Sequence, residues 1–115
     1  KKILNDMKAW GSNIINIIAV IGPCIKFKNY EVKTDFKRKF MKKYNCYQCF
    51  VQKNNMIYFD LSKFIEKQLR ENGIKNIEII NKDTFIRKNK FYSARYSLKK
   101  NYNDYGRNIS LIMIK

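Results

Sequence analysis

The sequence contains no histidine, which limits the chemistry that the chain can carry by itself. Imidazole is the general base of Ser-His-Asp and Cys-His catalytic arrangements and a common ligand of zinc. A self-sufficient hydrolase or zinc enzyme is therefore not expected. The three cysteines, Cys24, Cys46 and Cys49, are an odd number without the spacing of a disulfide framework. They favour a reducing compartment, so a cytoplasmic location is expected.

Cys46 and Cys49 have the two-residue spacing of half a zinc knuckle. A four-ligand zinc site needs a second pair of cysteines or histidines to complete it, and the sequence supplies neither. The sequence therefore favours two ordinary cysteines in an aromatic-rich segment over a metal or redox site.

Long apolar runs are also missing. The most apolar stretch, residues 14–25, is interrupted by Asn16 and by Gly22-Pro23, and it is shorter than the roughly 20 residues of a membrane-spanning helix. No membrane segment is expected, and the first residues lack the apolar region of a secretory signal. No segment rich in Pro, Gly or Ser marks a linker, so residues 1–115 are expected to form a single domain.

Acidic residues are few, since 9 Asp and Glu stand against 25 Lys and Arg, which gives a net charge of +16. Such an excess attracts polyanions, and aromatic residues interleave with lysines over residues 85–105. A small basic RNA-binding or ribosome-associated protein is therefore one candidate. However, the lysines are spread along the chain, no known RNA-binding motif occurs, and joint enrichment of Lys, Asn, Ile, Tyr and Phe also results from an A- and T-rich coding sequence.

Hydrophobic periodicity predicts helices that alternate with buried strands. Apolar residues at helical spacing predict a helix over residues 3–10, one that Asn29 caps and that carries Val32, Phe36 and Phe40 on one face, and one that runs from Asp60 to Gly73. Apolar, largely β-branched runs predict strands, buried on both faces, at residues 17–21, 74–80 and 107–114. Residues 44–59 are predicted to form a loop or irregular hairpin, and the fold class is α+β, a layered sheet with packed helices.

Two features could bind an anion. The turn Gly22-Pro23-Cys24 at a strand end can place a thiol and backbone N–H groups at the lip of a pocket, although a strand terminator with a buried thiol explains it as well. Arg95 and Arg107 lie in apolar or aromatic surroundings, where a guanidinium can bind phosphate or carboxylate. Stacking on tyrosine or pairing with Asp104 is the structural alternative for these arginines.

The same segments, read in order, resemble the laccase-domain (YfiH-like) family. Residues 19–25 with Asn29-Tyr30-Glu31-Val32 are similar to its Gly-Pro-Cys-Ile segment and the Tyr-Glu-Val that follows. Residues 91–95 and 104–110 are similar to its aromatic-Ser-x-Arg-Arg and Gly-Arg stretches. Two departures stand out, because Tyr96 replaces the second Arg of the pair and Asp83-Thr84 replaces Cys-Thr.

The resemblance implies an enzyme family. Its members were first called multicopper polyphenol oxidases and are better described as purine nucleoside phosphorylases, which cleave adenosine, inosine and methylthioadenosine with phosphate and deaminate adenosine. The resemblance places this chain in the carboxy-terminal half of a YfiH-like α/β sandwich. It also implies that Arg95, Arg107, Ser93 and Cys24 are the candidates for binding substrate or phosphate.

The resemblance also implies zinc held by two His and one Cys, with one His in a His-Ala-Gly-Trp segment ahead of the first helix. None of these motifs occurs here, so no metal ligand and no bound cofactor are expected in this chain alone. It is expected to be inactive by itself, a truncated or split member of the family, and a separate amino-terminal half is its candidate partner.

Overall fold

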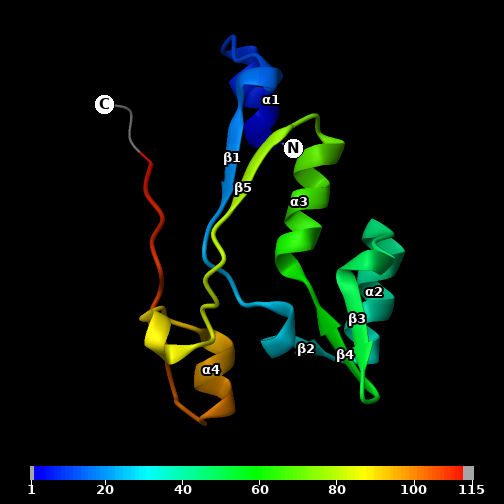
Figure 1. Ribbon diagram of the computed structural model, residues 1–115, viewed down its shortest axis with the longest axis vertical. Helices are drawn as coiled ribbons and strands as arrows, with labels where there is room; N and C mark the ends of the chain where they lie inside the picture. Colours follow the sequence, from blue (N-terminus) through cyan, green and yellow to red (C-terminus); the bar gives the residue numbers. More distant parts are fainter. Residues whose placement is uncertain (1, 113–115) are drawn as a thin grey trace.

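The structure, a computed structural model, describes residues 2–112 of the chain. Within them, short helices and strands follow one another along the chain, and the strands form two small sheets (Figure 1). The helices are α1 (Lys2–Ala9), α2 (Thr34–Tyr44), α3 (Leu61–Glu71) and α4 (Ala94–Lys99). The strands are β1 (Ile18–Ile21), β2 (Glu31–Val32), β3 (Phe50–Lys53), β4 (Met56–Phe59) and β5 (Asn76–Ile79). This is the predicted α+β class.

The first sheet consists of β1 and β5, which run parallel with Ile18 opposite Asn76 and Ile21 opposite Ile79. Helix α3 contacts both strands, and Ile21 is buried. Ile18 and Val20 point the other way, because side chains alternate along a strand, and both are exposed. The prediction that these strands are buried on both faces is therefore wrong for this chain, since helix packing covers one face only.

The second sheet has the order β2-β4-β3 and is antiparallel. Strands β3 and β4 form a hairpin whose turn residues, Asn54 and Asn55, both have positive φ of 49° and 58°, as a type I′ turn requires. The segment predicted as a loop or irregular hairpin is thus a regular one. The main core of the chain contains Phe59 of β4 and the two cysteines Cys46 and Cys49, which are buried among aromatic rings.

The second helix begins later than predicted. Glu31 and Val32 pair with Tyr58 and Ile57 in the sheet, and Asn29 ends a 3-10 turn (Phe27–Asn29) rather than capping a helix. Helix α2 starts at Thr34, after Lys33. Its Phe36 and Phe40 do share a face, and their rings stack with centroids 5.7 Å apart. Sheet pairing overrides the helical pattern here, because it satisfies backbone groups of Glu31 and Val32 directly.

The helices α1 and α3 are confirmed together with their caps. The carboxylate of Asp60 accepts a hydrogen bond from the Lys63 N–H at 3.0 Å, which is the N-cap contact that the sequence predicts. Gly11 and Gly73 follow α1 and α3, each with φ of +90°, the left-handed conformation that ends a helix.

The predicted terminal strand is absent from the described residues. Residues 107–112 are extended but pair with no strand within residues 2–112, and Met113 and Ile114 lie outside the described range. A strand requires a neighbour for its backbone groups. In contrast, the short helix α4 was not predicted, because its six residues are too few to show helical periodicity.

Candidate functional site

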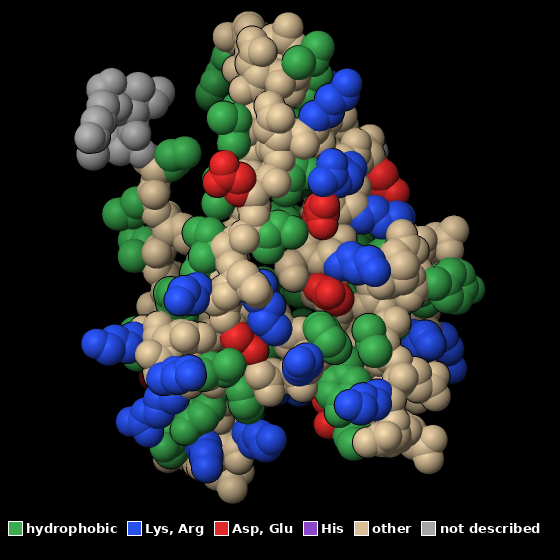
Figure 2. All heavy atoms as spheres, viewed as in Figure 1, with side chains coloured by type: hydrophobic (Ala, Val, Ile, Leu, Met, Phe, Trp, Pro, Cys, Tyr) green, Lys and Arg blue, Asp and Glu red, His purple; other side chains and the backbone are tan. Residues whose placement is uncertain are grey.

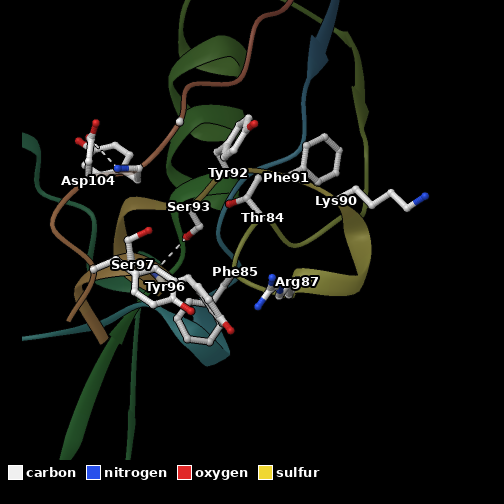
Figure 3. A pocket seen from close by; sticks show the side chains of 13 residues that line it. Thr84, Phe85, Arg87, Lys90, Phe91, Tyr92, Ser93, Tyr96, Ser97 and Asp104 are labelled. Atoms are coloured by element: carbon white, nitrogen blue, oxygen red, sulfur yellow. Dashed lines mark hydrogen bonds between the residues drawn. The ribbon is translucent and has the colours of Figure 1, made fainter. Parts of the chain in front are cut away.

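Helix α4 and the segments on either side of it enclose the pocket that carries the candidate site. The cavity has a volume of about 480 Å³. Figure 3 shows the hydroxyl groups of Thr84 and Ser93 between two sets of rings, with Phe91 and Tyr92 on one side and Phe85 and Tyr96 on the other. The remaining lining residues are Arg87, Lys90, Ser97, Tyr102, Asp104, Tyr105 and Gly106.

Ser93 holds the start of α4 in place. Its Oγ accepts a hydrogen bond from the Tyr96 N–H at 3.3 Å, which caps the helix and directs Tyr96 toward the pocket. The Tyr96 ring meets the edge of Phe85 at a centroid distance of 5.6 Å and that of Tyr102 at 6.4 Å. These three rings form one wall of the cavity.

The opposite wall joins two segments that are distant in the sequence. Tyr92 donates its backbone N–H to the Asn108 side-chain oxygen at 3.0 Å, and the Asn108 amide donates back to the Tyr92 carbonyl at 2.8 Å. Gly106 packs on the Tyr92 ring so closely that an added Cβ would lie 2.6 Å from ring atoms. The structure therefore brings together the two stretches, residues 91–95 and 104–110, that carry the family resemblance.

A second cavity of about 460 Å³ adjoins the first and shares Thr84, Tyr92 and Ser93 with it. Arg95 and Tyr30 line this second cavity. The turn at Cys24 lies directly behind it, because Thr84 donates its N–H to the Cys24 carbonyl at 3.3 Å. Of the four candidate residues, Ser93 and Arg95 therefore line this second cavity, whereas Cys24 lies just outside its lining.

The thiol of Cys24 is partly buried and free. Burial raises the pKa of this thiol above its ordinary value, and the neighbouring Lys26 and a hydrogen bond with Ser62 only partly oppose the rise. The sulfur is therefore protonated near neutral pH and is a poor nucleophile. The interpretation as a strand terminator with a buried thiol fits this environment better than a reactive cysteine does.

Asp83, which stands where the family has Cys, is buried beside this turn. Its carboxylate accepts hydrogen bonds from the Asn29 amide at 2.7 Å and from the Phe85 N–H at 2.8 Å. The two bonds fix the chain just before Thr84 and Phe85, so the departure from the family pattern has a structural role here.

Both candidate arginines are exposed and stack on tyrosine rings. The Arg95 Cζ lies 5.3 Å from the centroid of Tyr30, and the Arg107 Cζ lies 4.3 Å from that of Tyr105. Arg107 also donates from Nη1 to the Tyr105 carbonyl at 2.7 Å. Within residues 2–112, Arg95 has no hydrogen-bond or ion-pair partner and Arg107 does not pair with Asp104. The stacking alternative therefore describes both residues, and the Arg95 donors remain available to a ligand.

The cysteine pair differs from the interpretation as two ordinary thiols, because Cys46 and Cys49 form a disulfide. The 3-10 turn Tyr47–Cys49 brings their Cα atoms to 5.6 Å, the usual separation for such a bond. Within the described part of the chain, no group of three or more His, Cys, Asp or Glu side chains is placed to hold a metal ion. With no histidine and two cysteines bonded to each other, the donor set does not fit a zinc site.

Sequence reasoning missed most of the aromatic lining. In the sequence, Phe85, Tyr102 and Tyr105 stand out only as aromatic residues among lysines, and Tyr96 only as a departure from the family pattern. The signal available was the density of aromatic residues on both sides of Ser93, but their convergence depends on tertiary contacts. A separate structural result is that no helix in residues 2–112 is long and apolar enough to cross a bilayer.

The comparison with known proteins follows the same segments. The family model for multi-copper polyphenol oxidoreductase laccase, the laccase domain, matches residues 1–115. The chain belongs to the laccase-domain family. Among curated relatives, a purine nucleoside phosphorylase of Rickettsia conorii is 41% identical over an alignment of 93 residues that covers 76% of this chain and 39% of the relative. One of Rickettsia prowazekii is 38% identical over an alignment of 105 residues that covers 87% of this chain and 43% of the relative.

This laccase-domain chain therefore spans about two fifths of the length of the curated relatives that it matches. The match to the R. prowazekii protein covers most of the chain, so the pocket described above belongs to a region that the two share at least in large part. More than half of the length of each relative lies outside the region that it shares with this chain.

Proposed function

We propose that this chain forms the substrate-binding part of a purine nucleoside phosphorylase. The observation that carries the proposal is its 41% and 38% identity to two proteins with that name. The substrates proposed are adenosine, inosine and methylthioadenosine together with phosphate, with deamination of adenosine as a second activity.

The geometry of the two cavities supports a nucleoside ligand. The rings of Phe85, Tyr96 and Tyr102 offer flat apolar surface on which a purine base can stack. The hydroxyls of Thr84 and Ser93 at the boundary between the cavities offer hydrogen bonds to a ribose. We assign phosphate to Arg95, because its guanidinium is held by stacking on Tyr30 and keeps its N–H donors free.

The proposed phosphorolysis requires zinc ligands that this chain does not supply. Zinc in the family would polarise an oxygen or activate a nucleophile when bound, but the residues present here do not fit such a site. The raised pKa of Cys24 offers no thiolate in its place. The proposal is therefore that the chain binds and orients substrate and is inactive until another polypeptide supplies the metal ligands.

The test is phosphate-dependent release of base from each nucleoside by the purified chain, alone and mixed with a separately expressed part of the R. conorii relative that lies outside the matched region. Zinc content is measured on the same samples. The expected result is no base release and no zinc in the chain alone, with both appearing in the mixture. Activity with bound zinc in the chain alone would overturn the proposal, as would silence of a mixture that has formed a complex.

The role of Arg95 is tested in the active mixture. Arg95→Ala should raise KM for phosphate at least tenfold, because a charge-assisted contact to phosphate is lost, and should leave KM for the nucleoside nearly unchanged. Arg38→Ala is the matched control, since Arg38 is also exposed but lies on α2 and pairs with Asp35. Equal kinetics of the two variants would show that Arg95 does not bind phosphate.

A further inference from the structure

The β1–β5 sheet and the terminal segment, residues 109–112, expose a large amount of apolar side chain. Ile18 is 66% exposed and Val20 is 56% exposed on β1, while Ile109, Leu111 and Ile112 are 81%, 85% and 100% exposed. Figure 2 shows hydrophobic side chains along the flank of the upper part of the molecule and on the extended segment beside it. We call these residues of β1 and the terminal segment the open apolar surface.

This surface is unusual for a folded chain. Parallel strands occur almost only in sheets that are covered on both faces, and a two-stranded sheet is marginal in water by itself. The radius of gyration is 16.3 Å, whereas a compact domain of this length has a radius of about 13 Å. The parallel sheet therefore has the apolar sequence of a sheet in a protein interior, but one of its faces is exposed to solvent.

The backbone gives a second indication. Strand β1 pairs with β5 alone, so its other edge is unpaired within the described residues. Residues 109–112 are extended, and their backbone groups make no hydrogen bond within residues 2–112. In Figure 1 this terminal segment runs on the β1 side of the sheet, separated from it. The unpaired edge of β1 and the extended residues 109–112 are both apolar. Such segments are suited to pair with strands from another polypeptide.

We propose that the open apolar surface is a docking site for the remainder of the family fold, a polypeptide that adds strands beside β1 and pairs residues 109–112. The occupant is inferred from length, because the match to this chain covers only 39% and 43% of its two relatives and leaves more than half of each relative outside the shared part. The inference rests on the proposed function for its identification of the partner, and it names the surface through which the missing metal ligands would be brought to the pocket.

The probe is the part of the R. prowazekii relative outside the matched region, expressed as a separate polypeptide and mixed with the full chain. Its affinity is measured by titration, the stoichiometry by light scattering, and the contact surface by hydrogen exchange. The expected result is a one-to-one complex in which amides of Ile18–Ile21 and residues 109–112 exchange at least tenfold more slowly. Strands β3 and β4, on the other sheet, should exchange at unchanged rates.

A pair of variants distinguishes docking at this surface from nonspecific binding. Ile18→Lys should weaken binding at least tenfold, because it places a charge at the centre of the new interface. Tyr47→Lys adds the same charge at a residue of similar exposure, 70%, in the 3-10 turn that precedes β3 of the other sheet, and should bind like the parent chain. Circular dichroism confirms that both variants keep the fold of the parent.

Three results would overturn the inference. One is a probe that binds the corresponding segment of its own relative but not this chain. Another is a homodimer of this chain that protects the same amides, since a second copy would then be the occupant. The third is equal loss of binding in both variants. These readouts need no catalysis, so a complex that forms but releases no base would refute the proposed function and leave the docking site in place.

Discussion

At the residue scale, the contact between Gly106 and the Tyr92 ring shapes the candidate site. A Cβ at this position would lie 2.6 Å from two ring atoms and 2.7 Å from a third. The Asn108 side chain holds the Tyr92 backbone through two hydrogen bonds, so an added Cβ must displace the ring itself or the segment around Gly106. Tyr92 also belongs to both cavities, so any movement of this ring changes the space available to a ligand.

Gly106→Ala is therefore expected to destabilise the chain by about 1–3 kcal/mol, the usual cost of forcing extra volume into a packed contact. Urea unfolding gives the free energy of unfolding, and nucleoside binding by calorimetry reports on the pocket. Gly22→Ala is the control, because an added Cβ there meets nothing within 4 Å. If both variants unfold at the same urea concentration, the close contact between Gly106 and Tyr92 does not exist in solution.

Single residues were predictable where their role depends on near neighbours. Asp60 could be identified as an N-cap because its partner, Lys63, is three residues away. The position of Ser93 and Arg95 at a cavity followed from the family pattern, but the pattern did not reveal that Arg95 stacks on Tyr30 or that Gly106 packs on Tyr92. Those contacts join segments far apart in the sequence, and no local rule encodes them.

At the scale of elements, the disulfide links the end of α2 to the beginning of β3. Cys46 and Cys49 are both fully buried in the aromatic cluster with Phe59. The Cys49 carbonyl also accepts a hydrogen bond from the Asp60 N–H at 2.7 Å, so the same turn supports the start of α3. Loss of the bond should loosen the second sheet and leave the β1–β5 sheet largely unaffected.

Replacing both cysteines with alanine should lower the free energy of unfolding by about 2 kcal/mol, which is the chain-entropy estimate for such a short loop. A buried cavity adds to this loss. Urea unfolding of the variant, and of the parent with and without a thiol reductant, measures the effect. Cys24→Ala serves as control for the reductant arm, because Cys24 is not in the disulfide. A parent protein whose stability is insensitive to reductant would show that the bond is absent in solution.

The elements that the sequence predicts correctly are those with complete local signals. Helix α3 has a cap, an apolar stripe and a terminal glycine, and all three are observed. The sequence predicts the start of α2 too early, because Val32 fits a helical stripe equally well and only its pairing with Ile57 excludes it from the helix. The predicted terminal strand needs a neighbouring strand that residues 2–112 do not supply, so its apolar alternation does not lead to a strand in this structure.

At the scale of the whole molecule, the net charge of +16 is not by itself evidence for a specific nucleic-acid site. Figure 2 shows Lys and Arg scattered over the visible face with carboxylates among them. The charge alone attracts nucleic acid through release of counterions, without any sequence preference. A basic surface of this kind is therefore expected to bind nucleic acid in vitro whether or not the protein acts on nucleosides.

The expected behaviour is binding to single-stranded RNA that is equal for different base sequences and that falls about 300-fold between 50 and 200 mM salt if roughly six phosphates are neutralised. Because the charge is distributed, Lys42→Gln with Lys43→Gln on α2 and Lys99→Gln with Lys100→Gln beside α4 should weaken binding by similar factors. Fluorescence anisotropy with two unrelated RNA sequences measures both effects. A tenfold preference for one RNA, or loss of binding in only one of the double variants, would reveal a defined RNA site and favour the RNA-binding alternative over a nucleoside phosphorylase.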